Sequence, residues 1–228
     1  MHPLFVEPLR FEEGRVWVLT IEHPGLFRRM VEELILQSEG GEGAFVLSLE
    51  FEPLDCAERL LVVSDLFHLE WKERKLLNRL QQMVRRIDGE RLQESAAKLT
   101  LALRSYLAEL AQQLDYPVVY DEAVDFTALR KAAGFGLAIE GEETLERLLS
   151  YLSTYSGLME RSCFVLIGAK TLFGEEELRE LYRMAAYRKW DLLLLERVAL
   201  PPVEGEAHCL LDGDLCVLSN TQAQDALL

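Results

Sequence analysis

The stretch from Cys163 to Leu195, CFVLIGAKTLFGEEELRELYRMAAYRKWDLLLL, sets the fold class of this 228-residue chain. It begins and ends in short apolar runs, Cys163–Ile167 and Leu192–Leu195, whose unbroken hydrophobicity is typical of strands that are buried on both faces. Residues Gly174–Trp190 between them predict a helix, which opens with Glu175-Glu-Glu177 at its positively polarised N-terminus. Strand, helix and strand in this order predict an α/β domain with a largely parallel sheet.

The N-terminal part of the chain repeats this pattern. A strand is expected at Val16–Ile21, a helix over Leu26–Gln37, and a second buried strand at Leu60–Ser64. Residues Leu4–Arg10 also have strand composition and are expected to pair with Val16–Ile21 as a hairpin. Near the other end, residues 207–218 predict a closing hairpin that turns at an Asp-Gly pair.

The middle of the chain has a different character. Between Trp71 and Leu114 there is no proline and a single glycine, so we expect two long helices or one helix with a break. A heptad seam runs along the second part, at Leu92, Ala96, Leu99, Leu103, Tyr106 and Leu110. We therefore predict an α/β head built from residues 1–70 and 161–228, with a helical leg, residues 71–160, inserted between them.

An α/β head raises the possibility of nucleotide binding. The phosphate-binding motif Gly-x-x-x-x-Gly-Lys-Ser/Thr is absent from the sequence. Gly168-Ala-Lys-Thr171 follows a predicted strand but lacks the first glycine, which favours an ordinary turn between strand and helix. No two histidines have metal-ligand spacing and no Gly-x-Ser-x-Gly elbow occurs. We assign no catalytic residue and expect a protein that is not an enzyme.

Charge is distributed unevenly along the chain. The formal net charge is −15, which taken alone argues against non-specific binding to nucleic acid. Between residues 71 and 104, however, nine Lys and Arg side chains face four carboxylates. At about 100° per residue, Lys72, Lys75, Arg79 and Arg86 fall on one helical stripe. Such a stripe suits the phosphate backbone of duplex DNA, and the alternative is a solvated helix face.

Residues 105–160 are acidic, with ten carboxylates against three cations. The densest part is Asp121-Glu-Ala-Val-Asp125, which is expected in a loop. Carboxylates that cluster without Cys or His suit a hard cation, Ca²⁺ before Mg²⁺. The alternative is that they cap helices, and Asp125 in particular is a good N-cap for the helix that is expected after it.

Two further observations bear on the compartment. The first residues lack the basic and apolar regions of a signal peptide, and no run approaches the roughly 18 apolar residues of a membrane span. The four cysteines form no Cys-x-x-Cys pair, which favours free thiols in a reducing compartment. We expect a cytoplasmic protein without a membrane partner.

The order of these pieces resembles one known family, the ring-forming Csn-two family of type II-A CRISPR-associated adaptation proteins. The resemblance covers most of the chain, and an ordered set of short motifs carries it. These are Val16-Trp-Val-Leu-Thr-Ile-Glu22, Leu61-Val-Val-Ser-Asp-Leu-Phe67, Leu114-Asp-Tyr-Pro-Val-Val-Tyr-Asp-Glu122, Ala128-Leu-Arg-Lys-Ala132, Glu146-Arg-Leu-Leu-Ser-Tyr-Leu152, Phe164-Val-Leu-Ile167, Glu175-Glu-Glu-Leu-Arg-Glu-Leu-Tyr182, Leu192-Leu-Leu-Leu-Glu196 and Leu211-Asp-Gly-Asp-Leu-Cys216.

The resemblance implies a head related to P-loop ATPases but without a functional nucleotide site, and a helical leg. It implies a homotetrameric ring that threads the ends of linear double-stranded DNA, held by calcium ions, in spacer acquisition beside the CRISPR integrase and the effector nuclease. The family's metal ligands cluster around a Tyr-Asp-Glu stretch, here Tyr120-Asp121-Glu122. Asp121 and Glu122 are carried over as calcium ligands, and Asp115 and Asp125 are added by proximity. Two rival hypotheses are an NTPase or nuclease on the head and a helical scaffold that does not bind DNA.

Overall fold

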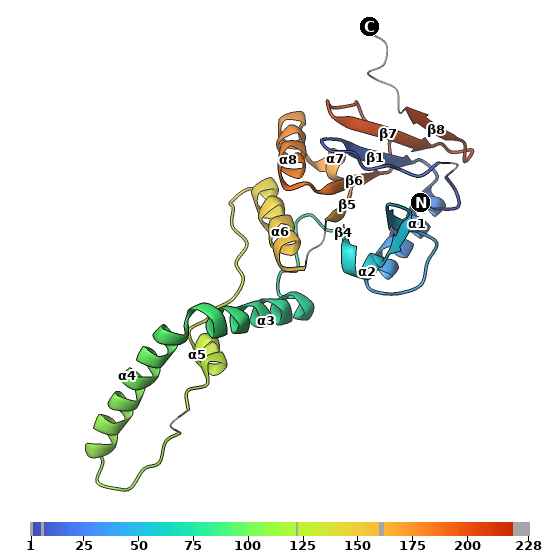
Figure 1. Ribbon diagram of the computed structural model, residues 1–228. Helices are drawn as coiled ribbons and strands as arrows, with labels where there is room; N and C mark the ends of the chain where they lie inside the picture. Colours follow the sequence, from blue (N-terminus) through green and yellow to red (C-terminus); the bar gives the residue numbers. More distant parts are fainter. Residues whose placement is uncertain (1, 6, 122, 160–161, 221–228) are drawn as a thin grey trace. The chain divides into compact units, whose positions relative to one another are not determined.

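The computed structural model describes residues 2–5, 7–121, 123–159 and 162–220. Figure 1 shows its helices and strands. The chain divides into two compact units, which are taken here in turn. The sheet unit consists of the residues up to Glu70 and from Ile139 onward, and the helical unit consists of Trp71–Ala138.

A six-stranded sheet in the order β4-β5-β6-β1-β7-β8 forms the centre of the sheet unit. Its strands are β1 (Val16–Ile21), β4 (Leu60–Val63), β5 (Cys163–Ile167), β6 (Asp191–Glu196), β7 (Glu206–Leu211) and β8 (Val217–Asn220). All neighbouring strands are parallel except β7 and β8, which form an antiparallel pair. The prediction of an α/β fold with a largely parallel sheet is therefore confirmed.

Helices cover both faces of this sheet. Figure 1 shows α1 and α2 on one side and α7 and α8 on the other. The remaining elements of the unit are α1 (Pro24–Ser38), α2 (Cys56–Arg59), α6 (Thr144–Met159), α7 (Ala169–Leu172), α8 (Glu175–Arg188) and a small hairpin of β2 (Leu47–Leu49) and β3 (Glu52–Leu54). All six residues of β1 are buried because the strand lies between β6 and β7. This placement explains why β1 is apolar at every position except Thr20.

The described N-terminal residues, 2–5 and 7–10, do not form the expected strand. Both edges of β1 are hydrogen-bonded, to β6 and to β7, so no edge is left for Leu4–Arg10 to pair with. The segment packs by its side chains instead, with Phe5 buried in the core. It is also fixed by the indole N–H of Trp17, which donates to the carbonyl of Arg10 at 2.7 Å. The predicted closing hairpin, in contrast, is present as β7 and β8.

Helix α6 belongs to the sheet unit, although we expected it within the leg at residues 71–160. Its burial gives the physical reason, because an apolar stripe of this width needs cover along the whole helix. The buried positions are Leu145, Leu148, Leu149, Tyr151, Leu152, Tyr155 and Leu158. The helical unit accordingly ends at Ala138.

The helical unit contains α3 (Arg74–Arg91), α4 (Gln93–Gln112) and α5 (Phe126–Ala132). Helix α3 continues through Gly89, so the break lies at Leu92 rather than at the glycine. No residue of α4 is buried, and the seam residues Leu99 and Tyr106 are 46% and 59% exposed. No helix in the described part of the chain is both long and apolar enough to cross a membrane.

Candidate functional site

Three of the predicted DNA-binding cations form an exposed stripe on α3. Lys75, Arg79 and Arg86 lie within about 40° of one another around the helix axis, because positions four and eleven residues apart return to nearly the same direction. All three are exposed. The guanidinium of Arg79 donates to Oε1 of Gln82 at 3.5 Å. We call Lys75, Arg79 and Arg86 the cationic stripe.

Lys72 does not lie on this helix. Helix α3 begins at Arg74, and Lys72 is in the turn before it. Its Nζ atom lies 4.9 Å from the ring centroid of Trp71, a cation–π contact. The expectation that all four cations share one helical face is therefore wrong for Lys72, because helical periodicity has no meaning outside the helix. Lys72 is exposed and remains a candidate DNA contact from the turn.

The stripe is dense enough to attract a polyanion. It runs over about 16 Å of helix axis from Lys75 to Arg86, at 1.5 Å per residue. Helix α3 carries six cations and only two carboxylates, Asp88 and Glu90. Within the described residues, neither Lys75 nor Arg86 forms an ion pair. Their charges are therefore available to phosphate groups, several of which a duplex presents over such a distance.

The predicted metal ligands lie along the segment between α4 and α5. Asp115 and Asp121 are exposed, and Glu122 lies outside the described residues. Asp125 is the N-cap of α5, and its Oδ1 accepts hydrogen bonds from the N–H groups of Thr127 and Ala128 at 2.8 and 3.1 Å. The alternative reading of Asp125 as a helix cap is thus realised. Capping by Asp stabilises a helix by about 1 kcal/mol.

The described carboxylates of this segment lie too far apart to surround a calcium ion by themselves. Calcium takes six to eight oxygen ligands. Within the described residues, no group of three or more Asp, Glu, His or Cys side chains is close enough to hold a metal ion. In addition, one oxygen of Asp125 is already engaged by two N–H groups. Glu122 lies outside the described residues, so the assignment of Asp115, Asp121, Glu122 and Asp125 as calcium ligands stays a prediction.

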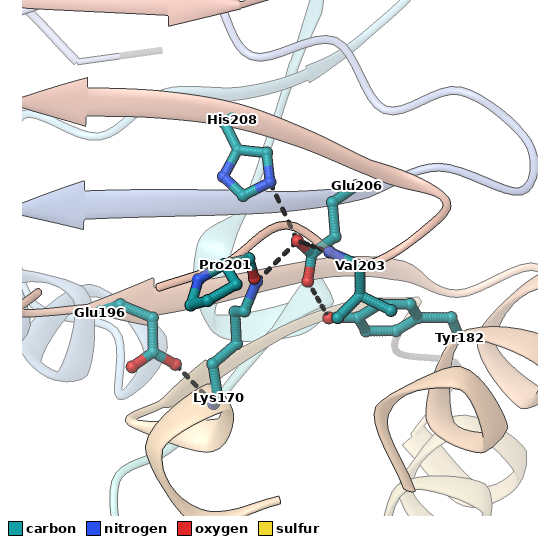
Figure 2. Close-up of polar contacts among 7 residues, drawn as sticks. All are labelled: Lys170, Tyr182, Glu196, Pro201, Val203, Glu206 and His208. Atoms are coloured by element: carbon teal, nitrogen blue, oxygen red, sulfur yellow. Dashed lines mark hydrogen bonds and ion pairs between the residues drawn. The ribbon is translucent and has the colours of Figure 1, made fainter. Parts of the chain in front are cut away.

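A buried polar cluster between the sheet and its helices was not predicted. Figure 2 shows Glu206 of β7 at its centre. The Lys170 ammonium of α7 lies 2.6 Å from Oε2 of Glu206, and the Tyr182 hydroxyl of α8 donates to Oε1 at 2.5 Å. The N–H of Val203 donates to Oε2 at 2.9 Å, and Nε2 of His208 lies 2.9 Å from the same oxygen. One carboxylate therefore joins two helices, a strand and a loop.

The electrostatics of the cluster keep Glu206 ionised. Burial alone opposes its charge, but the contacts from His208, Lys170, Tyr182 and the Val203 N–H outweigh burial and lower the pKa of Glu206 to about 2. Burial raises the pKa of Tyr182, and its hydrogen bond to the carboxylate raises it further. The pair therefore contains a buried carboxylate and a neutral phenol that donates to it.

The contacts of this cluster also involve the segment Gly168–Thr171, which the sequence places where a phosphate-binding loop could lie. Gly168 adopts φ +73°, a left-handed turn that glycine permits, and leads from β5 into α7. The N–H of Lys170 donates to Oε1 of Glu196 at 2.8 Å, and the Thr171 hydroxyl donates to Oε2 at 3.3 Å. Both side chains that a phosphate-binding loop would use are thus bonded to carboxylates of this chain. The expectation of an ordinary turn agrees with this geometry.

Two long-range contacts could not be predicted from the sequence. Glu206 has no motif around it, and its partner Lys170 is 36 residues away. In the helical unit, the guanidinium of Arg130 on α5 pairs with Asp88 on α3, 42 residues away. Arg130 lies in the Ala128–Ala132 motif, but nothing in the sequence indicated its partner.

The comparisons with known proteins identify the family. The model of the family described as CRISPR-associated protein (Cas_Csn2) matches residues 37–215, which include every described element from β2 to β7. A search of curated proteins found no match. A family model that spans most of the chain agrees with the resemblance inferred from the ordered motifs. The chain therefore belongs to the Csn2 family of type II-A CRISPR-associated proteins, and its role is CRISPR-associated.

Proposed function

We propose that this protein is a non-enzymatic accessory of CRISPR adaptation that binds the ends of linear double-stranded DNA during spacer acquisition. The observation that carries the proposal is the cationic stripe of α3 in a chain whose net charge is −15. Its partners in this role are the CRISPR integrase and the effector nuclease of the type II system, as the resemblance implies.

The physical basis is the contrast between the stripe and the rest of the chain. Cations that neutralise phosphates supply sequence-independent affinity, because phosphates position a protein without identifying a base. An acidic surface elsewhere repels the same polyanion and confines it to the stripe. Binding to duplex DNA without sequence preference follows from this arrangement.

We propose a homotetrameric ring as the functional form. The support is the uncovered seam of α4, where Leu99 and Leu110 are 46% and 44% exposed and the preceding Leu92 is 43% exposed. A heptad seam of this kind is usually covered by another helix. A closed ring would place the stripes of four copies around one duplex, and it would load DNA only at an end. We also propose that calcium ions hold the ring, with Asp121 and Glu122 as two of their ligands. Further ligands are needed to complete the coordination shell.

The head is proposed to be P-loop-ATPase-like without nucleotide activity. Lys170 and Thr171 contact Glu206 and Glu196, which supports the absence of a phosphate site at this turn. The rival hypothesis of an NTPase or nuclease predicts phosphate release from ATP or cleavage of duplex DNA. We expect neither phosphate release nor DNA cleavage above a blank without protein. Each assay is repeated after successive purification steps, because a contaminating enzyme would be removed by them.

A gel-shift experiment with linear duplex and closed circular DNA of the same sequence tests the proposal. Linear DNA is expected to bind, and closed circles are expected to bind at least tenfold more weakly. Lys75→Ala with Arg86→Ala should weaken binding to linear DNA, whereas Arg28→Ala, an exposed cation on α1, should not. Equal affinity for circles would contradict threading. The absence of binding to any DNA would favour the helical scaffold.

A further inference from the structure

Helix α5 is held against α3 by one long-range ion pair. The guanidinium of Arg130 lies 2.5 Å from Oδ2 of Asp88, and the two side chains are 23% and 31% exposed. No residue of α5 is buried, and Leu129 is 38% exposed. Apolar packing therefore contributes little to holding this seven-residue helix in place, and the partly buried ion pair is a specific contact that ties it to α3.

The position of Asp88 on α3 decides where α5 can lie. Asp88 follows Arg79 by nine residues, which places it about 180° around the helix from Arg79. The ion pair therefore attaches α5 to the side of α3 that faces away from the cationic stripe. It also neutralises one of the two carboxylates of α3, two residues after Arg86.

The other end of α5 connects to the acidic segment. Asp125, the last residue of that segment, caps α5 through the N–H groups of Thr127 and Ala128. The ion pair at the C-terminal end of α5 and the cap at its N-terminal end thus form a continuous link. It runs from the stripe-bearing helix to the segment that was predicted to bind calcium.

We propose that Asp88 and Arg130 are positioning residues, which fix α5 on the back of α3 and thereby keep the cationic stripe rigid for DNA. This inference rests on the proposed DNA-binding function. Only Leu76 of α3 is buried, so the helix depends on its neighbours for order. Losing α5 would leave α3 freer to fray, and DNA binding would then have to order the stripe at a cost in affinity.

The variant Asp88→Asn separates positioning from simple charge. By charge alone, removing a carboxylate should strengthen binding to DNA; if the pair positions α5, Asp88→Asn should instead weaken it about three- to tenfold. The matched control is Glu90→Gln on the same helical turn, which removes the same charge from an exposed residue. Glu90→Gln should bind DNA as well as the original protein or up to about twofold better.

Hydrogen exchange of the free full-length protein gives a readout that does not depend on DNA. Peptides that cover Phe126–Ala132 should exchange faster in Asp88→Asn than in Glu90→Gln, and the swap of Asp88→Arg with Arg130→Asp should restore slow exchange and most of the affinity. Exchange in α5 that matches the control, or DNA binding in Asp88→Asn as tight as in Glu90→Gln, would overturn the inference. If no variant binds DNA, the proposed function fails, while the exchange data still decide whether the pair positions α5.

Discussion

The Nζ atom of Lys170 lies 2.6 Å from Oε2 of Glu206, and the two side chains are only 2% and 0% exposed. Nζ also donates to the carbonyl of Pro201 at 2.9 Å. Lysine and glutamate are almost never buried to this degree unless they are paired. In this chain the pair fixes α7, which follows the turn at Gly168, to β7.

Replacing Lys170 by methionine should strongly destabilise the protein. Lys170→Met leaves the buried Glu206 without its cation, and breaking a buried pair in this way costs about 3–5 kcal/mol. Urea unfolding measures the loss, with Lys131→Met on exposed α5 as the control, expected within about 0.5 kcal/mol of the original protein. Adding Glu206→Gln to Lys170→Met should recover part of the stability. A loss no larger than that of the control would contradict the pairing.

The pH dependence of stability should show the ionised state of Glu206. Its pKa falls from 4.5 to about 2 in the folded protein, because contacts with His208, Lys170, Tyr182 and Val203 outweigh burial. A lowered pKa stabilises the fold above the unfolded value, and this contribution is lost as the pH falls from about 4.5 towards 2. Burial raises the pKa of Glu196, which acts in the opposite direction.

The measurement that isolates Glu206 is the free energy of unfolding of the original protein minus that of Glu206→Gln. This difference should be constant above about pH 5 and should shrink as the pH is lowered to 3. Since Glu196 is present in both proteins, its titration cancels to first order. A difference that does not change between about pH 5 and pH 3 would mean that the contacts of the folded protein do not lower the pKa of Glu206.

Calcium should stabilise the protein if the acidic segment binds it. An ion that binds only the folded state, at a hundredfold excess over its Kd, contributes about 2.7 kcal/mol, which is roughly 5–10 °C in Tm for a chain of this size. Asp121→Asn should reduce the increase in Tm. Asp125→Asn should reduce it as well while keeping α5, because Asn caps a helix as well as Asp does. A chelator control accompanies each melt, and equal calcium responses in all variants would remove these residues from the site.

Self-association should depend on the seam of α4. Leu99→Glu places a charge in the middle of an apolar stripe whose cover is proposed to be another copy of the chain, so the tetramer should dissociate into smaller species. Ala97→Glu, an exposed position on the far side of α4, is the matched control and should remain tetrameric. Light scattering at micromolar concentration with calcium present measures both. A monomeric original protein under these conditions would contradict the ring.

Local patterns predicted the elements of this fold well, and long-range contacts explain the errors. The apolar runs at Cys163–Ile167 and Leu192–Leu195 lie within β5 and β6, because a strand covered on both faces needs no polar residue. Leu4–Arg10 has strand composition too, but β6 and β7 already occupy both edges of β1. Which strands become neighbours is decided by the whole chain, and a seven-residue pattern contains no information about it.

In the candidate sites, too, local features were predictable from the sequence and long-range contacts were not. Lys75, Arg79 and Arg86 were predictable because helical spacing alone places them together, and Asp125 as a cap because capping is local. The sequence wrongly placed Lys72 on the helix, which begins two residues later at Arg74. The start of α3 has no side-chain cap that would have marked it. The contact of Glu206 with Lys170 joins residues far apart in sequence, so no local signal could reveal it.

Salt dependence should identify the cationic stripe as the surface that binds DNA. Each phosphate neutralised by a Lys or Arg contributes a slope of about −0.9 to the plot of log affinity against log salt concentration. Lys75→Ala removes one such contact per copy, so the slope should become shallower by about 0.9 for each copy whose Lys75 touches DNA. In a ring of four copies the change could approach about 3.6 in total. Because phosphates alone are contacted, the loss should be the same for duplexes of unrelated sequence.

Two other variants locate the surface further. Lys72→Ala should change the slope less than Lys75→Ala, because Lys72 lies in the turn before α3 and its Nζ atom rests on the ring of Trp71. Arg28→Ala, on α1 of the sheet unit, should leave the slope unchanged. The measurement is fluorescence anisotropy of a labelled linear duplex between about 50 and 200 mM salt, the range over which phosphate-driven binding changes most steeply. If Lys75→Ala kept the full slope while Arg28→Ala lost part of it, the DNA surface would lie on the sheet unit and not on α3.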